Sequence, residues 1–168
     1  MSNRLAQMPL PAQPGCVDSH TDLAAWLAER WTIDRLFRDR RLGIDGRFRG
    51  SGRFVPDGEG LRYDETGTLT FGDHSGPAHQ THLYRFPEPG AALVLFGDGR
   101  PFHRLEPIGG IARPRHDCGP DLYRGRVTFR LPDDWTVCWR VRGPRKHLLI
   151  ASRLRRAISP RPSEEGLP

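Results

Sequence analysis

The chain has 168 residues, enough for one domain with a hydrophobic core and too few for a comfortable second one. Hydrophobic residues make up 36%, and the 19 glycines and 16 prolines argue against a helical bundle and for short strands joined by turns. The net charge of +6 comes from arginine, since Lys146 is the only lysine, but acidic residues are interspersed and no long basic block occurs, which disfavours a nucleic-acid binder.

The three cysteines form no C-x-x-C pair and no disulfide framework, which suits a reducing compartment. No segment approaches the ~20 apolar residues needed to span a bilayer. The N-terminus also lacks an apolar run of signal-peptide length. We therefore expect a soluble, cytoplasmic protein with no membrane partner.

Both ends of the chain are rich in proline and polar residues. Residues 1–18 are predicted to form a flexible arm and residues 159–168 a flexible tail, which leaves residues 19–158 as a single β-barrel domain. The domain begins with a predicted helix of about three turns. Ser19 or Thr21 is expected to cap it, with Asp22 in its first turn and an apolar face of Leu23, Trp26 and Leu27.

From Trp31 onward the apolar residues recur at every second position, which is typical of strands. The pattern predicts nine or ten strands, around residues 31–37, 48–54, 61–65, 69–71, 82–86, 92–96, 102–105, 123–131, 135–141 and 147–154. Gly50 and Gly52 predict a bend within the second of them. No helix between them is long enough for a parallel crossover. We therefore expect an all-β fold, a closed antiparallel up-and-down β-barrel of about 8–10 strands with a short N-terminal helix; a two-sheet sandwich is the alternative.

A helix leading into Trp31, together with an arginine-bearing last strand, resembles the calycin architecture of lipocalins, fatty-acid-binding proteins and avidins. The resemblance implies that an arginine from the last strand lies against Trp31, with Arg153 and Arg155 as the two candidates. The lipocalin G-x-W triplet is absent, because Glu29-Arg30 precedes Trp31.

Several motifs in order resemble a family of uncharacterised bacterial and fungal proteins over about residues 31–155. They are G-x-F-x-G from Gly46, L-R-Y-D-E-x-G from Leu61, F-G-D-G-R-P-F-H from Phe96, H-D-C-x-x-D-x-Y from His116 and W-x-V-x-W-x-V-x-G-P-x-K from Trp135. The resemblance implies a calycin-type barrel and brings no activity.

Polar chemistry is concentrated between Phe96 and Tyr123. If their strands are neighbours, His103 and His116 lie close together, and with Asp121 or Cys118 they resemble a zinc-type metal site, although the spacing matches no compact metal motif. Two partly buried histidines bonded to backbone carbonyls are the alternative. A nucleophilic role for Cys118 is disfavoured because no orienting residue accompanies it.

Aromatic and polar residues at inward positions predict a small-molecule cavity, with a filled aromatic core as the alternative. The candidate ligand-binding residues are Tyr63, Glu65, Tyr84, Arg100, His103, His116, Asp121, Tyr123 and Trp139. A buried Glu65 needs a partner, for which Arg100, His103 and Arg153 are the candidates. Asp98-Gly99 is predicted to be a hairpin turn.

The first hypothesis is a small-molecule-binding barrel whose ligand and cofactor are unknown. The second is a barrel enzyme (a cyclase, isomerase or hydrolase) in which His103 or His116 acts as acid or base and Asp121 orients it; a haem or metal variant uses His103, His116 or His147 as a ligand. The third is a nucleic-acid binder that uses the outward arginine rows, which lack the interleaved aromatic residues of a stacking platform. The oligomeric state stays open, a homodimer included.

Overall fold

The computed structural model describes residue 17 and residues 21–157. The predicted tail of residues 159–168 lies outside the described residues, and so does the predicted arm except for Val17. That residue is fully buried, and its carbonyl oxygen accepts a hydrogen bond from the Gly110 N–H at 2.9 Å. Within the described part of the chain, no helix is both long and apolar enough to cross a membrane.

One short helix precedes eleven strands in the described residues. They are α1 (Leu23–Leu27), β1 (Arg30–Asp39), β2 (Ile44–Asp57), β3 (Gly60–Phe71), β4 (His74–Arg85), β5 (Ala92–Phe96), β6 (Pro101–Leu105), β7 (Ile111–Ala112), β8 (Arg115–Cys118), β9 (Asp121–Arg130), β10 (Asp134–Gly143) and β11 (Lys146–Arg156). The helix is shorter than the predicted three turns. Its cap is Asp22, whose Oδ1 accepts the Ala25 N–H at 2.9 Å, and not Thr21; Ser19 lies outside the described residues.

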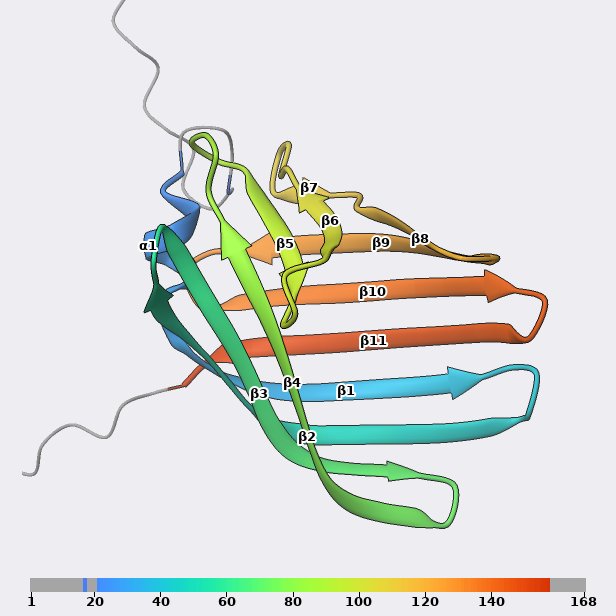
Figure 1. The fold of residues 1–168 in the computed structure, drawn as a ribbon. Helices are drawn as coiled ribbons and strands as arrows, with labels where there is room; N and C mark the ends of the chain where they lie inside the picture. The colour runs from blue at the N-terminus through green and yellow to red at the C-terminus, as the bar shows by residue number, and fades with distance from the viewer. Residues whose placement is uncertain (1–16, 18–20, 158–168) are drawn as a thin grey trace, which may run out of the picture.

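All eleven strands belong to one antiparallel sheet (Figure 1). Strands β1 to β6 pair in sequence order, β9, β10 and β11 do the same, and the pairing of β1 with β11 joins the two series. The short strands β7 and β8 both pair with β9, and β8 contacts β6 at the other end of the sheet. The predicted up-and-down barrel is therefore confirmed, and the two-sheet sandwich is wrong.

The curvature of the sheet depends on close backbone contact between β2 and β3. Gly50 and Gly67 face each other across the two strands, and a Cβ on Gly50 would come within 2.2 Å of the Thr66 carbonyl oxygen. Only glycine permits this approach, and both strands bend along their length in Figure 1. The predicted bend in this part of the chain thus has a steric cause.

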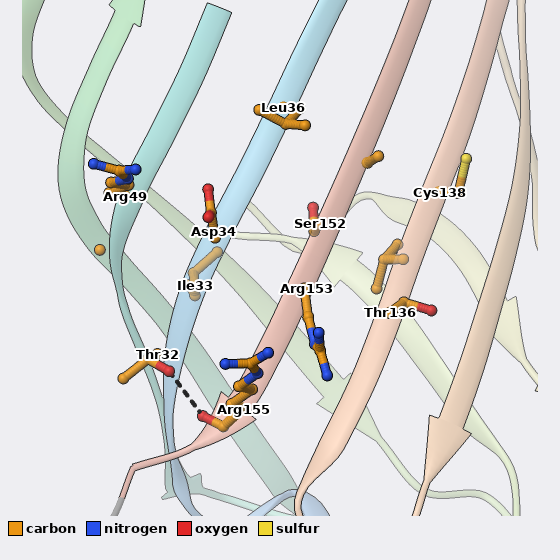
Figure 2. Close-up of a pocket in the computed structure, with 13 residues that line it drawn as sticks. Thr32, Ile33, Asp34, Leu36, Arg49, Thr136, Cys138, Ser152, Arg153 and Arg155 are labelled. Atoms are coloured by element: carbon orange, nitrogen blue, oxygen red, sulfur yellow. Dashed lines mark hydrogen bonds between the residues drawn. The ribbon is translucent and has the colours of Figure 1, made fainter.

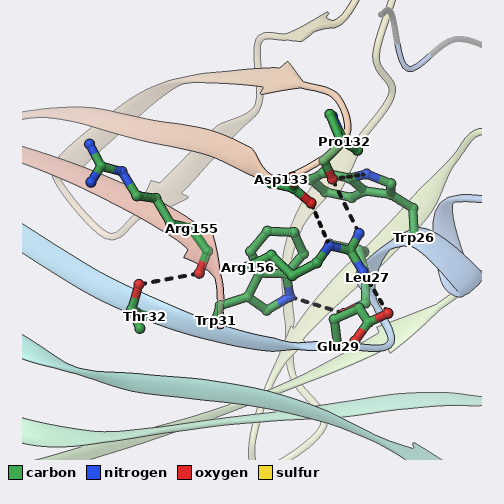
Figure 3. Close-up of polar contacts among 9 residues, drawn as sticks. All are labelled: Trp26, Leu27, Glu29, Trp31, Thr32, Pro132, Asp133, Arg155 and Arg156. Carbon is green, nitrogen blue, oxygen red and sulfur yellow. Dashed lines mark hydrogen bonds and ion pairs between the residues drawn. The ribbon is translucent and has the colours of Figure 1, made fainter. Parts of the chain in front are cut away.

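Helix α1, Trp26 and Trp31 pack together at one end of the barrel (Figure 3). Trp31 is fully buried, its indole N–H donates to the Leu27 carbonyl oxygen at 3.1 Å, and its ring lies 4.9 Å from that of Trp26. The Trp26 indole N–H donates to the Pro132 carbonyl oxygen at 3.1 Å. Because the polar atoms of both rings bond to backbone, this end packs as a dry core.

The arginine on Trp31 is Arg156, which corrects the choice between Arg153 and Arg155. Its guanidinium lies 5.3 Å from the Trp31 ring centre and pairs with Glu29 at 2.5 Å and Asp133 at 3.1 Å. The reason is register: Trp31 pairs with Arg156, so both side chains point inward, while the two predicted arginines occupy outward positions.

Candidate functional site

A cavity of about 890 Å³ occupies the barrel interior beyond the tryptophan-filled end. The residues predicted to bind a ligand line it, with one exception: they are Tyr63, Glu65, Tyr84, Arg100, His103, His116, Tyr123 and Trp139. Seven of these residues lie on β3, β4, β6, β8, β9 and β10, and Arg100 lies in the turn between β5 and β6. Asp121 is the exception.

A buried ion pair forms part of one wall. Arg35 of β1 donates from Nη2 to Glu65 Oε1 at 2.7 Å and from Nε to the Ser152 hydroxyl at 2.8 Å. The Glu65 side chain is 5% exposed and that of Arg35 16%, so the pair is largely removed from water. This corrects the three partners predicted for Glu65, since Arg100 pairs with Asp98 and Arg153 with Asp134.

Two tyrosines adjoin this ion pair. Tyr63 stacks on Phe54 at 4.3 Å, and its buried hydroxyl has no hydrogen-bond partner among the described residues. Burial, together with the nearby Glu65 charge, raises the pKa of Tyr63 well above its ordinary value. Burial likewise raises the pKa of Tyr84. Both phenols therefore keep their protons and are hydrogen-bond donors.

His82 joins the polar wall to an aromatic one. Its Nε2 lies 3.2 Å from the Gln80 side-chain nitrogen, and burial lowers its pKa, so the neutral ring accepts at Nε2 and carries its proton on Nδ1. On its other side the ring stacks on Phe102, with centres 5.4 Å apart and planes 16° apart.

Phe102 is the centre of the aromatic wall. Trp139 lies 5.4 Å from it at 28°, and the rings of Phe96, His103 and His116 lie 4.6, 4.7 and 5.0 Å away. Burial lowers the pKa of His103 to about 4. Its Nδ1 lies 3.3 Å from the Arg104 carbonyl oxygen, which only accepts, so the proton is on Nδ1 and Nε2 is an acceptor.

Asp121 lies outside the cavity lining and is engaged elsewhere. Its carboxylate pairs with Lys146 at 2.7 Å, and the same ammonium donates to the Tyr123 hydroxyl at 3.2 Å. Within the described residues neither His103 nor His116 bonds to a carboxylate. The predicted acid–base pair of a histidine with Asp121 is therefore wrong, because Lys146 holds the carboxylate that would orient the ring.

The other residues predicted to be functional between Phe96 and Tyr123 lie in a turn, at the mouth of the cavity or at its rim. Gly99 has a φ of +86° and Asp98 accepts the Arg100 N–H at 3.0 Å, as expected of a hairpin turn. Arg100 lies at the mouth with its side chain 77% exposed. Cys118 is an exposed free thiol at the rim. In the part of the chain that the structure covers, no three His, Cys, Asp or Glu residues lie close enough to share a metal ion.

Four residues that line the cavity were not predicted as site residues from the sequence: Arg35, Gln80, His82 and Ser152. Arg35 follows Trp31 and Ile33 at the same inward parity of β1, and Ser152 precedes Leu154 in the same way on β11. Parity along each strand was thus the available signal, but an arginine at an inward position runs against the usual preference for burying apolar side chains.

A second hollow, of about 610 Å³, lies on the outside of strands β2, β1, β11 and β10 (Figure 2). Leu36, Ala151 and Cys138 are among its lining residues. Arg49, Arg153 and Arg155 also line it (Figure 2). Several outer arginines are paired, Arg47 with Asp34 and Arg153 with Asp134. The arginine rows therefore coat the outer face.

Comparison with known proteins gives a family and a fold. The model of a family of unknown function, DUF6314, matches residues 27–156. No curated protein matches the chain. The S-type phycobiliprotein lyase CPES from Guillardia theta superposes with a TM-score of 0.55 at 12% identity, over 80% of this chain and 90% of the lyase. A redesigned β-barrel, mFAP1, bound to DFHBI, gives 0.41 at 14% identity, over 81% of this chain and all of that one.

Proposed function

The chain belongs to the DUF6314 family of unknown function, and we propose that this member binds a small organic molecule inside its barrel. The observation that carries the proposal is the cavity of about 890 Å³, which is within the usual size range of ligand pockets. One wall is aromatic, centred on Phe102 and Trp139, and the other holds the Arg35–Glu65 pair and two protonated tyrosines. An apolar surface with a few convergent polar groups is the usual make-up of such a pocket.

Burial of the ion pair supports a binding role over a purely structural one. A buried pair contributes little net stability, because desolvation offsets its attraction, and a packed apolar core of the same volume is often as stable. Here both residues of the pair line the cavity, so the pair is part of its wall. The fold is shared with a phycobiliprotein lyase, but at 12% identity that likeness concerns the fold alone.

The experiment is native mass spectrometry of the protein purified from its own host, to find a small molecule that co-purifies with it. The matched variants are Val94→Phe, which puts a ring into the cavity from β5, and Leu93→Phe, which puts the same ring on the outside of that strand. We expect the bound mass in the wild type and in Leu93→Phe, and its loss in Val94→Phe. Equal occupancy in both variants would remove the interior from consideration.

Two further expectations accompany this proposal. The partner is a small molecule and not nucleic acid, because the outer arginines are partly neutralised by Asp34 and Asp134. Salt-sensitive binding of a generic oligonucleotide would contradict this. The location is cytoplasmic, in keeping with the free thiols of Cys118 and Cys138.

A further inference from the structure

Two neighbouring turns gather arginines at the end of the barrel opposite α1 (Figure 1). The β1–β2 turn carries Arg40 and Arg41, and the β10–β11 turn carries Arg145. The Arg41 guanidinium donates to the Arg145 carbonyl oxygen at 2.9 Å, which joins the two turns. Arg142 lies beside them near the end of β10, with its Nη1 at 3.3 Å from His147 Nδ1. These four exposed arginines, 40, 41, 142 and 145, form a basic tip.

The positive charge of the basic tip is not neutralised by the chain. Within the described residues, none of its four arginines forms an ion pair with a carboxylate, and the nearest acidic side chains have other partners. Asp121 pairs with Lys146 at 2.7 Å, and Asp45 pairs with Arg38 at 3.1 Å. The tip therefore carries unpaired cations on a surface open to solvent.

An exposed leucine follows two of these arginines in the same turn. Leu42 is 62% exposed, which is unusual for a large apolar side chain. The turn that carries it is well defined, because Asp39 Oδ1 accepts the N–H groups of Arg41 at 2.8 Å and of Leu42 at 3.0 Å. Gly43 completes it with a φ of +67°. The backbone thus holds Leu42 outward, next to the arginines.

The basic tip borders the cavity. Lys146, which follows Arg145, donates to the Tyr123 hydroxyl at 3.2 Å, and Tyr123 lines the cavity. Cys118 and Gly119 also line it, and they lie at the β8–β9 turn at the same end of the barrel (Figure 1). A surface that contacts the tip therefore lies close to the rim of the cavity.

We propose that the basic tip docks the protein on an anionic lipid surface, with its arginines at the headgroups and Leu42 in the interface. Arginines near such a surface each strengthen binding, and an apolar side chain that enters the interface adds to it. Docking goes beyond ligand binding, and it would bring the rim of the cavity to the bilayer. The expectation of no membrane partner concerned spanning segments, which peripheral contact does not need.

Size and charge favour lipid over a protein partner. A stable protein interface takes about 20–30 residues from each side, whereas the tip consists of two short turns. A second copy of this chain would bring like charges together, which opposes association.

The test is co-sedimentation of the full chain with vesicles of phosphatidylcholine alone and of phosphatidylcholine with about 30% phosphatidylserine. We expect binding to the anionic vesicles and little to the neutral ones. Raising the salt from about 0.1 M to about 0.5 M should weaken binding, because screening becomes stronger.

Two matched pairs of arginines locate the contact. Arg40→Gln with Arg145→Gln should weaken binding to the anionic vesicles about 30-fold, since two of the four cations are lost. Arg49→Gln with Arg53→Gln removes the same charge from exposed positions on the side of the barrel, and should weaken binding less than about threefold.

Two leucines test the apolar contribution. Leu42→Ser should weaken binding about tenfold. Leu36→Ser, at a residue 54% exposed on the side of the barrel, should bind the vesicles as the wild type does.

Three results would overturn the proposal. They are no binding to the phosphatidylserine vesicles, equal losses in the two arginine pairs, and binding to poly-L-glutamate without binding to these vesicles. The last result would assign the basic tip to an acidic protein. Because the vesicle test contains no cavity ligand, each of these outcomes leaves the proposed function intact.

Discussion

The two halves of the barrel use aromatic residues for opposite purposes. At the closed end, Trp26 and Trp31 pack against each other and their indole N–H groups bond to backbone carbonyls. In the other half, Phe102 and Trp139 line open space and the Tyr63 hydroxyl is left unpaired. A satisfied, filled aromatic cluster stabilises the fold, whereas an unfilled one with spare donors is suited to holding another molecule. Substitutions in the two halves should therefore separate stability from binding.

The largest loss of stability is expected from the closed end. Trp31→Ala removes a fully buried ring and should lower the free energy of unfolding by about 3–5 kcal/mol. The control is Leu36→Ala on the outward face of the same strand, where a side chain 54% exposed should change it by less than about 0.5 kcal/mol. Urea unfolding measures both, and similar midpoints for the two variants would contradict the importance of this end.

The next effect tests the ion pair in the cavity half. Glu65→Leu leaves the Arg35 charge without its carboxylate and should cost about 3 kcal/mol. The double variant Arg35→Met with Glu65→Leu should recover most of that loss. If the double variant is no more stable than the single one in urea unfolding, the pair is not the source of the loss.

A smaller effect distinguishes neighbouring arginines. Arg156→Met loses the contact with Trp31 and the pairs with Glu29 and Asp133, for about 1–2 kcal/mol. Arg155→Met, one residue earlier and outward, should change stability by less than about 0.5 kcal/mol. Thermal unfolding of both at equal ionic strength gives the comparison, and a reversed order would place the wrong arginine on the tryptophan.

The effect that is smallest at neutral pH appears only in acid. Burial lowers the pKa of His103 from 6.5 to about 4 in the folded protein, so between these values the unfolded chain binds more protons. His103 therefore reduces stability progressively as the pH falls from about 6.5 to about 4, and has little effect above that range. In His103→Gln the fall in melting temperature over this interval should be shallower. An unchanged slope would mean that the ring titrates normally.

Strand parity made much of the cavity predictable. Tyr63, Glu65, Tyr84 and Trp139 were expected at inward positions because apolar residues alternate around them, and all four line the interior. Alternation along a single strand determines which face of the sheet a side chain occupies. This assignment does not require knowing which strands are its neighbours.

Local sequence patterns could not predict which side chains pair with one another across strands. Which cation meets Glu65 depends on the pairing of β1 with β2 and of β2 with β3, which leaves one strand, β2, between Arg35 and β3. The arginine on Trp31 was missed for a narrower reason. The inward positions of β11, at Ser152 and Leu154, lead by twos to Arg156, which lies two residues beyond the predicted end of the last strand. Asp121 was predicted only from its nearness in sequence to the histidines, whereas its partner Lys146 comes from the start of β11.

The pairing of β1 with β11 also bears on how the chain folds. The hairpins from β2 to β5 join neighbours in sequence and can form as soon as they are made, but Trp31 pairs with Arg156, near the opposite end of the described chain. Contacts of such long sequence separation slow folding, because a large loop must close before they form. During synthesis Trp31 therefore lacks its contacts with β11 until nearly the whole domain has left the ribosome.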